Sequence, residues 1–165
     1  MKIYTKAGDD GTTGLFGSGR VPKNNVRIVA LGNVDEANAW LGLAQAALAG
    51  TPAEPLVAVL RHIQHRLFTL GSMVATPLDA PAYATIPQLT EADVVFLEKA
   101  IDRLDEDLAP LARFILPGGT EGSMRLHVAR GVVRRAERSL VAADRLPAGY
   151  TDPVTRRYLN RLSDF

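Results

Sequence analysis

Apolar residues recur at alternating three- and four-residue steps in five separate stretches of the chain, and this spacing constrains the fold more than any other feature. It places an apolar stripe along one face of an α-helix, and such a stripe must be buried against other helices. The stretches cover residues 34–48, 56–74, 94–108, 129–140 and 159–162. The pattern therefore predicts an all-α fold, a five-helix up-and-down bundle built from residues 26–165.

Residues that break or begin helices fall between these stretches. Breakers occupy residues 50–52, 77–87 and 117–120. Thr90 followed by Asp93 resembles a capping box, which predicts the start of the third helix there. Asp152 and Pro153 suit the N-cap and the first position of the fifth helix. A chain of 165 residues with these boundaries and no internal repeat is expected to form one domain.

The composition argues against several classes of function. A net charge of +1 gives no bulk electrostatic argument for binding nucleic acid or a membrane surface. Without cysteine, the chain forms no disulfide, cysteine zinc cluster or thiol nucleophile. It shows neither the apolar run of a signal peptide nor a segment long enough to span a membrane, so a cytoplasmic location is expected. His62, His65 and His127 do not form a convincing set of metal ligands.

Residues 1–25 are rich in glycine and lack apolar periodicity, which predicts an ordered or orderable loop with a short strand at residues 3–5. The glycines are Gly8, Gly11, Gly14, Gly17 and Gly19. Their backbone N–H groups can turn toward one point and bind phosphate. Hydroxyl and ammonium groups nearby belong to Thr5, Thr12, Thr13, Lys6 and Lys23. The segment lacks the Gly-Lys-Ser/Thr of a Walker A motif. Composition alone supports a phosphate-binding loop and a flexible tail equally.

The fourth stretch contains the sequence ARGVVRRAER, which places charged residues on one helical face. Arg130, Arg134, Glu137 and Arg138 are spaced at i, i+4, i+7 and i+8, opposite the apolar stripe. Several guanidinium groups on one face suit a polyphosphate, because their geometry matches phosphate oxygens. Glu137 among them would hold its neighbours in place or reach a magnesium ion. The ordinary alternative is a solvated basic face, and local reasoning favours that alternative.

Other polar and aromatic residues have structural explanations on local grounds. Asp35 and Glu36 stand at the start of the first apolar stretch, where acidic residues are ordinary partners of the helix dipole. Phe114, in the sequence FILPGG, is expected in the core, and Trp40 is expected to serve packing.

Taken in order, six blocks of this chain resemble the PduO-type ATP:cob(I)alamin adenosyltransferases. The blocks are YTKAGDDGTTGLFGSGRVPK, GNVDEANAWLGLA, IQHRLFTLGS, FILPGG, LHVARGVVRRAER and YLNRLSD. Residues 76–113 match in helical character only, and residues 76–89 have no inferable role. The resemblance implies transfer of the 5′-deoxyadenosyl group of ATP to cob(I)alamin, which gives adenosylcobalamin and triphosphate. Cobalt(I) is the nucleophile in that reaction, so the lack of a catalytic triad is consistent with it.

The resemblance also implies an assembly and a set of site residues. The whole chain, 1–165, would be one adenosyltransferase domain, with residues 1–25 as the ATP-binding loop, and three copies would form a homotrimer with active sites between adjacent subunits. The implied ATP-binding residues are Thr5, Lys6, Gly8, Thr13, Gly14, Lys23, Arg134, Glu137, Arg138 and Asn160. Asp35 and Arg130 would form a salt bridge across the subunit interface, and Phe114 would lie beneath the corrin ring. The residues implied in catalysis are Arg134, Asp35, Arg130 and Phe114, and Glu137 is the implied magnesium ligand.

The implied ligands are ATP as co-substrate, Mg²⁺, and cobalamin as substrate. A flavin-type reductase and an adenosylcobalamin-dependent enzyme would be partners. Neither a nucleic acid nor a membrane is an expected partner. The same binding residues would also suit a carrier or sensor that delivers adenosylcobalamin to a dependent enzyme. A helical interaction protein with a basic face is a third possibility, but such a bundle has no need of the glycine-rich segment. The family continues beyond its NRLSD sequence, which leaves two alternatives: a fifth helix that stops near Phe165 would loosen the corrinoid pocket, or this chain is shorter than the natural one.

Overall fold

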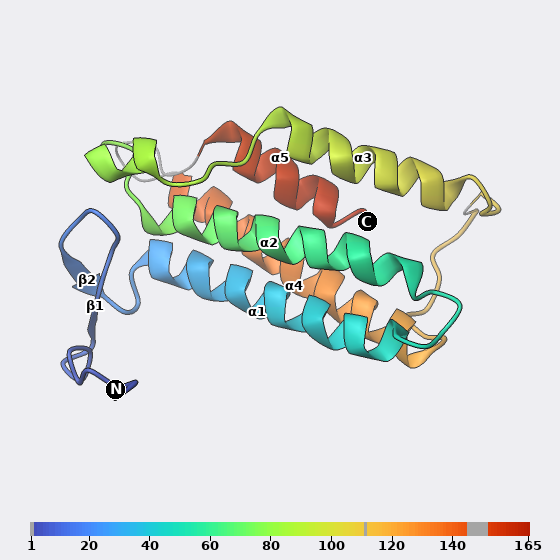
Figure 1. Ribbon diagram of the computed structural model, residues 1–165, viewed down its shortest axis with the longest axis horizontal. Helices are drawn as coiled ribbons and strands as arrows, with labels where there is room; N and C mark the ends of the chain where they lie inside the picture. Colours follow the sequence, from blue (N-terminus) through green and yellow to red (C-terminus); the bar gives the residue numbers. More distant parts are fainter. Residues whose placement is uncertain (1, 111, 145–151) are drawn as a thin grey trace.

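The computed structural model describes residues 2–110, 112–144 and 152–165, and it confirms the five predicted helices (Figure 1). They are α1 (Val26–Leu48), α2 (Pro55–Ala75), α3 (Glu91–Asp105), α4 (Glu121–Asp144) and α5 (Pro153–Leu162), with a short 3₁₀-helix η1 (Pro81–Thr85) between α2 and α3. Successive helices run in opposite directions along the bundle (Figure 1). Among the described helices, none combines the length and the apolar character needed to cross a membrane.

Local capping explains where several helices begin. Asn25 caps α1 through a hydrogen bond of 2.9 Å from the Arg27 N–H to its side chain. The predicted capping box between Thr90 and Asp93 is present at the start of α3. At α5, the Asp152 side chain accepts from the Val154 N–H at 2.9 Å, as the Asp-Pro pair predicts. These starts could be found from the sequence because each depends on neighbours within three residues.

The core lies where the apolar stripes meet. α1 packs against α2 and α4, and α5 packs against α4 and α3. Alanines such as Ala37 and Ala136 recur in the buried stripes of α1 and α4, and small side chains let two helices lie close together. At the start of α4, a Cβ atom added to Gly122 would lie only 2.5 Å from a methyl carbon of Leu48. Trp40 packs against the edge of this core, as expected.

The segment before α1 differs from its prediction. The strand expected at residues 3–5 is wrong, because Ile3 is 99% exposed and none of the residues that the structure describes pairs with that stretch. Instead β1 (Thr12–Gly14) pairs antiparallel with β2 (Arg20–Pro22). Gly17, in the connection between them, has φ +68°, a left-handed conformation that glycine adopts without steric cost. The bundle is therefore all-α, with a small two-stranded sheet outside it.

Candidate functional site

The N-terminal arm, residues 2–25, folds back on itself around the side chain of Arg20. The Nε atom of Arg20 donates to the Thr12 hydroxyl at 2.9 Å. Its Nη2 atom donates to the carbonyl oxygens of Thr12, at 3.1 Å, and of Ala7. Because the guanidinium donors are fixed in one plane, they hold these three acceptors in a fixed arrangement. The glycine-rich segment therefore has a defined fold.

Asp10 completes this arrangement. Its Oδ1 atom accepts from the Thr12 N–H at 2.9 Å and from the Thr12 hydroxyl at 2.8 Å, and lies 3.6 Å from Arg20. The hydrogen bond from the Thr12 backbone, with the hydroxyl and Arg20 as further causes, lowers the pKa of Asp10 below its ordinary value of 3.8. Sequence reasoning assigned no role to Asp10 or Arg20. Asp-Gly-Thr-Thr is a turn sequence that would have indicated Asp10, whereas the contacts of Arg20 span eight to thirteen residues.

Lys23 lies against the glycine-rich turn. Its N–H donates to the Gly11 carbonyl at 2.9 Å. A Cβ atom added to Gly8 would lie 3.2 Å from the Lys23 ammonium nitrogen. The backbone at Gly8 thus has a positive charge immediately beside it, and this combination suits an anion.

The other arm residues implied in ATP binding are spread along the same segment. Thr13 and Gly14 belong to β1, while Thr5 and Lys6 precede it and are exposed. Lys6 has φ 61°, a left-handed conformation that residues other than glycine rarely adopt. Such conformations occur often where a loop serves binding. The arm therefore brings Gly8 and Lys23 together and leaves Thr5 and Lys6 exposed on its surface.

A second group of polar residues joins α4 to α5. Asn160 donates from Nδ2 to the Glu137 carboxylate at 3.0 Å. Arg134 donates from Nη1 to the Ser163 hydroxyl at 3.4 Å, and Ser163 is only 2% exposed. Arg138 is exposed on the same face of α4. Sequence reasoning missed Ser163, because nothing in the chain near it indicates that it meets Arg134.

Phe114 is fully exposed, so the expectation that it belongs to the core is wrong. It lies in the connection between α3 and α4, where Ile115 and Leu116 are exposed as well. Exposed apolar side chains that follow one another often mark a binding surface. A cavity of about 780 Å³ borders Phe114 and Ile115, and its lining also includes His127, Arg130, Ser163 and Asp164.

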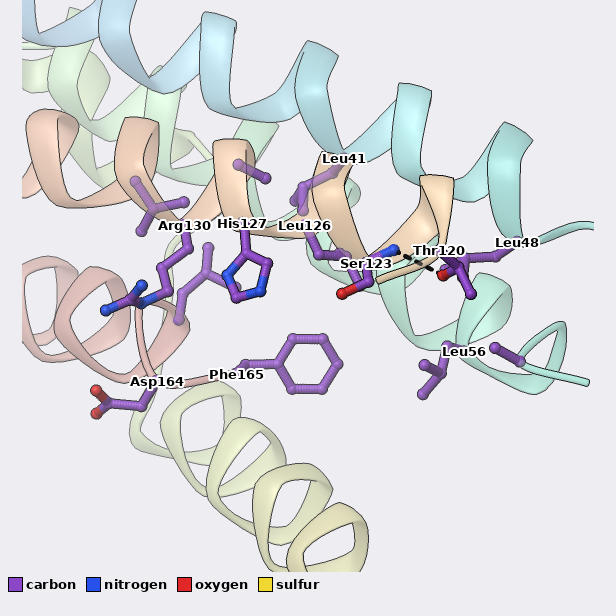
Figure 2. A pocket seen from close by; sticks show the side chains of 14 residues that line it. Leu41, Leu48, Leu56, Thr120, Ser123, Leu126, His127, Arg130, Asp164 and Phe165 are labelled. Atoms are coloured by element: carbon purple, nitrogen blue, oxygen red, sulfur yellow. Dashed lines mark hydrogen bonds between the residues drawn. The ribbon is translucent and has the colours of Figure 1, made fainter. Parts of the chain in front are cut away.

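An adjoining cavity of about 360 Å³ shares part of this lining (Figure 2). His127, Arg130 and Asp164 border both cavities. Figure 2 shows the His127 ring between the side chains of Arg130 and Phe165, with Leu48 and Leu56 farther along the apolar wall. The basic face of α4 is thus continuous with two largely apolar cavities, although sequence reasoning gave His127 no role.

The structure does not bring every expected site residue together. The N-terminal arm lies beyond the end of the bundle at which α1 begins (Figure 1). Within the described residues, no hydrogen bond or ion pair joins the arm to Arg134, Glu137 or Arg138. Asp35 is exposed and lines a groove between α1 and α2, whereas Arg130 lies at the α4 cavities. The N-terminal arm and the basic face of α4 are the two surfaces suited to anions, and they therefore lie apart within one chain.

No group of three or more metal-ligating side chains occurs in the described parts of the chain. Glu137 is a single half-buried carboxylate that is oriented by Asn160 and flanked by arginines. Mg²⁺ commonly binds through one or two carboxylates together with phosphate oxygens. The donor set around Glu137 is compatible with an ion that arrives with a polyphosphate.

Known proteins are similar in sequence to this chain along its whole length. The family described as Cobalamin adenosyltransferase matches residues 3–165. The chain is 45% identical over 166 residues to the corrinoid adenosyltransferase of Bacillus subtilis, covering all of this chain and 82% of that protein. It is 43% identical over 166 residues to the corrinoid adenosyltransferase of Mycobacterium leprae, covering 99% of this chain and 86% of that protein.

Solved structures agree with these relatives. A phenylalanine-to-alanine variant of the PduO-type ATP:corrinoid adenosyltransferase from Lactobacillus reuteri, complexed with cobalamin and ATP, superposes with a TM-score of 0.91 at 38% identity, covering 99% of this chain and 88% of that chain. An arginine-to-lysine variant complexed with ATP gives a TM-score of 0.88 at 38% identity, covering 98% and 88%. The resemblance drawn from the six sequence blocks is confirmed. This chain belongs to the cobalamin adenosyltransferase family.

Proposed function

We propose that this protein transfers the 5′-deoxyadenosyl group of ATP to cob(I)alamin, giving adenosylcobalamin and triphosphate. The observation that carries the proposal is the basic face of α4, which adjoins at Arg130 a cavity of about 780 Å³ whose lining includes the apolar side chains of Phe114 and Ile115. A corrin ring has apolar faces, and a triphosphate requires cations. Family membership and the cobalamin and ATP bound to the related structures support the same reaction.

The reaction needs alignment and charge stabilisation more than it needs a protein nucleophile. The cobalt electron pair forms the cobalt–carbon bond as the C5′–O5′ bond of ATP breaks, and the electrons of that bond leave with the triphosphate. The protein must therefore hold C5′ in line with cobalt and stabilise charge on the leaving group. Arg134, Arg138 and Lys23 carry charge suited to the second task, while Asn160 and Ser163 orient the groups around them.

We further propose that ATP is held between two copies of the chain in a homotrimer. The arm, with Thr5, Lys6, Gly8, Thr13, Gly14 and Lys23, would close over the ATP on the α4 face of a neighbouring subunit. The separation of arm and α4 face in one chain supports this arrangement, as does the exposure of Asp35 and Arg130. These two residues would then pair across the interface.

Glu137 would hold Mg²⁺ together with oxygens of the triphosphate. The ion would neutralise part of the phosphate charge when bound, as metal ions do in other nucleotide sites. Asn160 supports this role, because its hydrogen bond of 3.0 Å orients the carboxylate that would ligate the ion.

Phe114 would lie beneath the corrin ring. An apolar side chain at that position would exclude a lower axial ligand of cobalt, and axial ligation tunes the reduction potential of a metal. Its complete exposure beside the larger cavity supports this assignment. A flavin-type reductase would supply the reduced corrinoid, and an adenosylcobalamin-dependent enzyme would receive the product.

The decisive experiment is anaerobic incubation of the protein with ATP, Mg²⁺ and chemically reduced cobalamin, with the loss of cob(I)alamin absorbance as the signal. We expect formation of adenosylcobalamin and release of triphosphate. ATP binding without product over hours would instead favour the alternative, a carrier or sensor that delivers adenosylcobalamin. A protein that binds no ATP would exclude both functions.

A further inference from the structure

The C-terminus of α2 is capped by groups that belong to the N-terminal part of the chain. The Phe16 N–H donates to the Ala75 carbonyl at 3.0 Å. The Arg27 guanidinium donates from Nη1 to the carbonyl oxygens of Val74 and Thr76, at 2.8 and 3.0 Å. The last carbonyl groups of a helix have no partner within the helix, so these bonds satisfy acceptors that would otherwise need water. The arm is therefore attached to the bundle at the end of α2.

A second contact places the arm against η1. Gly17 lies so close to this 3₁₀-helix that an added Cβ atom would be 2.7 Å from the Cβ of Ala82 and 3.6 Å from that of Ala80. Carbon atoms in contact normally stay about 3.5–4.0 Å apart, so a side chain at position 17 cannot fit without movement. Glycine on one side and alanines on the other thus allow a very close approach of the two segments.

The segment that receives the arm is itself fixed to the bundle. Tyr83 and Ile86 pack against the core, and the Tyr83 N–H donates to the Ala80 carbonyl at 2.9 Å. Burial raises the pKa of the Tyr83 hydroxyl, with Asp152 as a further cause. The buried Leu89 N–H lies 3.2 Å from the Met73 sulfur, which ties the end of the segment to α2. Residues 76–89, which had no inferable role in the sequence, form an anchored surface rather than a free connection.

We propose that the end of α2 and residues 80–82 form a dock that sets the position of the N-terminal arm, and that Gly17 and Ala82 are positioning residues for ATP binding. This inference rests on the proposed function, because it assumes that the arm binds ATP. The hairpin and the Arg20 contacts join Gly17 to the part of the arm that carries Gly8 and Lys23. A shift at the dock therefore displaces the ATP-binding groups together.

The consequence is a specific kinetic signature. Docking holds the arm near its binding position before ATP arrives, so less conformational entropy of the arm is lost when ATP binds. Loss of the dock raises the KM for ATP by about tenfold while kcat at saturating ATP changes little, because bound ATP then holds the arm and Lys23 in place and the arginines of α4 are untouched. A residue with only a structural role would instead change the stability of the bundle and leave KM for ATP unaltered.

A matched pair of substitutions on η1 tests the dock from the bundle side. Ala82→Val adds methyl groups where Gly17 approaches, whereas Ala84→Val adds the same groups at an exposed position of the same short helix. We expect Ala82→Val to raise the KM for ATP and Ala84→Val to leave it unchanged. Equal KM values in the two variants would overturn the proposal.

A rescue experiment tests the same contact from the arm side. Gly17→Ala should raise the KM for ATP, and the double variant Gly17→Ala with Ala82→Gly should recover most of the loss because the obstructing Cβ is removed. Gly50→Ala is the control for a left-handed glycine with open space around it, at φ +71°. If the double variant shows no recovery, backbone strain rather than docking causes the effect, and the proposal fails.

Hydrogen exchange separates this inference from the proposed function. The Phe16 amide should exchange faster in Ala82→Val than in wild type or Ala84→Val, whether or not ATP is present. If the three proteins show this exchange pattern but the wild type binds no ATP, the dock exists and its proposed role in ATP binding is wrong. Unchanged exchange at Phe16 in Ala82→Val would discard the dock itself.

Discussion

Asn160 of α5 donates a hydrogen bond of 3.0 Å to the carboxylate of Glu137 on α4. The bond joins two helices through side chains separated by 23 residues in the sequence, and it orients a carboxylate that stands among arginines. Arg134, one turn earlier on α4, contacts Ser163 at the end of α5 in a similar way. The last turns of α5 thus hold two charged residues of α4 in position.

Glu137→Gln tests whether this carboxylate binds Mg²⁺. Glutamine can still accept the hydrogen bond from Asn160, so the substitution removes charge while it preserves geometry. We expect the Mg²⁺ concentration for half-maximal activity to rise by about tenfold or more, in line with losses at other metal sites. Glu121→Gln, at the exposed start of α4, should leave the Mg²⁺ dependence unchanged. An unaltered Mg²⁺ titration in Glu137→Gln would remove Glu137 as a ligand.

Arg134→Ala should slow the chemical step. Removal of a donor that stabilises developing charge costs about 2–4 kcal/mol, which corresponds to a loss of roughly 10²–10³ in kcat. Arg135→Ala is the matched control, because Arg135 is the next residue on α4 but pairs with Glu36 and donates to Asn33 at 3.0 Å. Single-turnover measurements with cob(I)alamin should separate the two variants. Similar rates in both would mean that Arg134 is a surface residue without a role in the reaction.

Phe114→Ala should lose activity without losing stability. Because Phe114 is fully exposed, its removal should change the free energy of unfolding by no more than about 0.5 kcal/mol. Leu60→Ala, in the fully buried stripe of α2, should cost about 2–5 kcal/mol by the same denaturant titration. The rate of adenosylcobalamin formation from cobalamin(II) and reductant should fall in Phe114→Ala. A variant as fast as wild type would rule out the proposed place beneath the corrin.

Phe114 is also an example of a residue whose environment could not be predicted from the local sequence. Periodicity located all five helices, and the caps at Thr90 and Asp152 located two of their starts, because those signals are local. An apolar residue in a loop carries no local sign of what covers it, so local reasoning placed Phe114 in the core and only the family resemblance placed it at a binding surface. The strand expected at residues 3–5 failed because pairing depends on a partner. Arg20 escaped notice because its acceptors lie far along the chain.

Asp10 gives the arm a defined pH dependence. Its pKa is lowered in the folded protein, so its contribution to the folded arm is complete above the ordinary value of 3.8 and is lost as the pH falls through the lowered pKa. The chemical shift of the Thr12 amide should therefore titrate with a midpoint below 3.8. Asp10→Asn should abolish that titration, and Asp9→Asn should preserve it. A wild-type midpoint at or above 3.8 would contradict the hydrogen bonds that Asp10 accepts.

The proposed location of the active site between subunits can be tested by mixing two inactive proteins. Lys23→Ala damages the arm and Arg134→Ala damages the α4 face, so each homotrimer alone should be nearly inactive. In a trimer each site would combine the arm of one chain with the α4 face of the next.

Random exchange of equal amounts of the two variants should then give an intact arm beside an intact α4 face at roughly one site in four. We expect about a quarter of wild-type activity after denaturation and joint refolding, and almost none when the refolded proteins are mixed without exchange. Mixed trimers that form, as judged by co-purification of two different affinity tags, but remain inactive would show that each site is built from a single chain. The arm would then have to move to the α4 face of its own bundle, a rearrangement that breaks the contacts of Phe16 and Gly17 with α2 and η1.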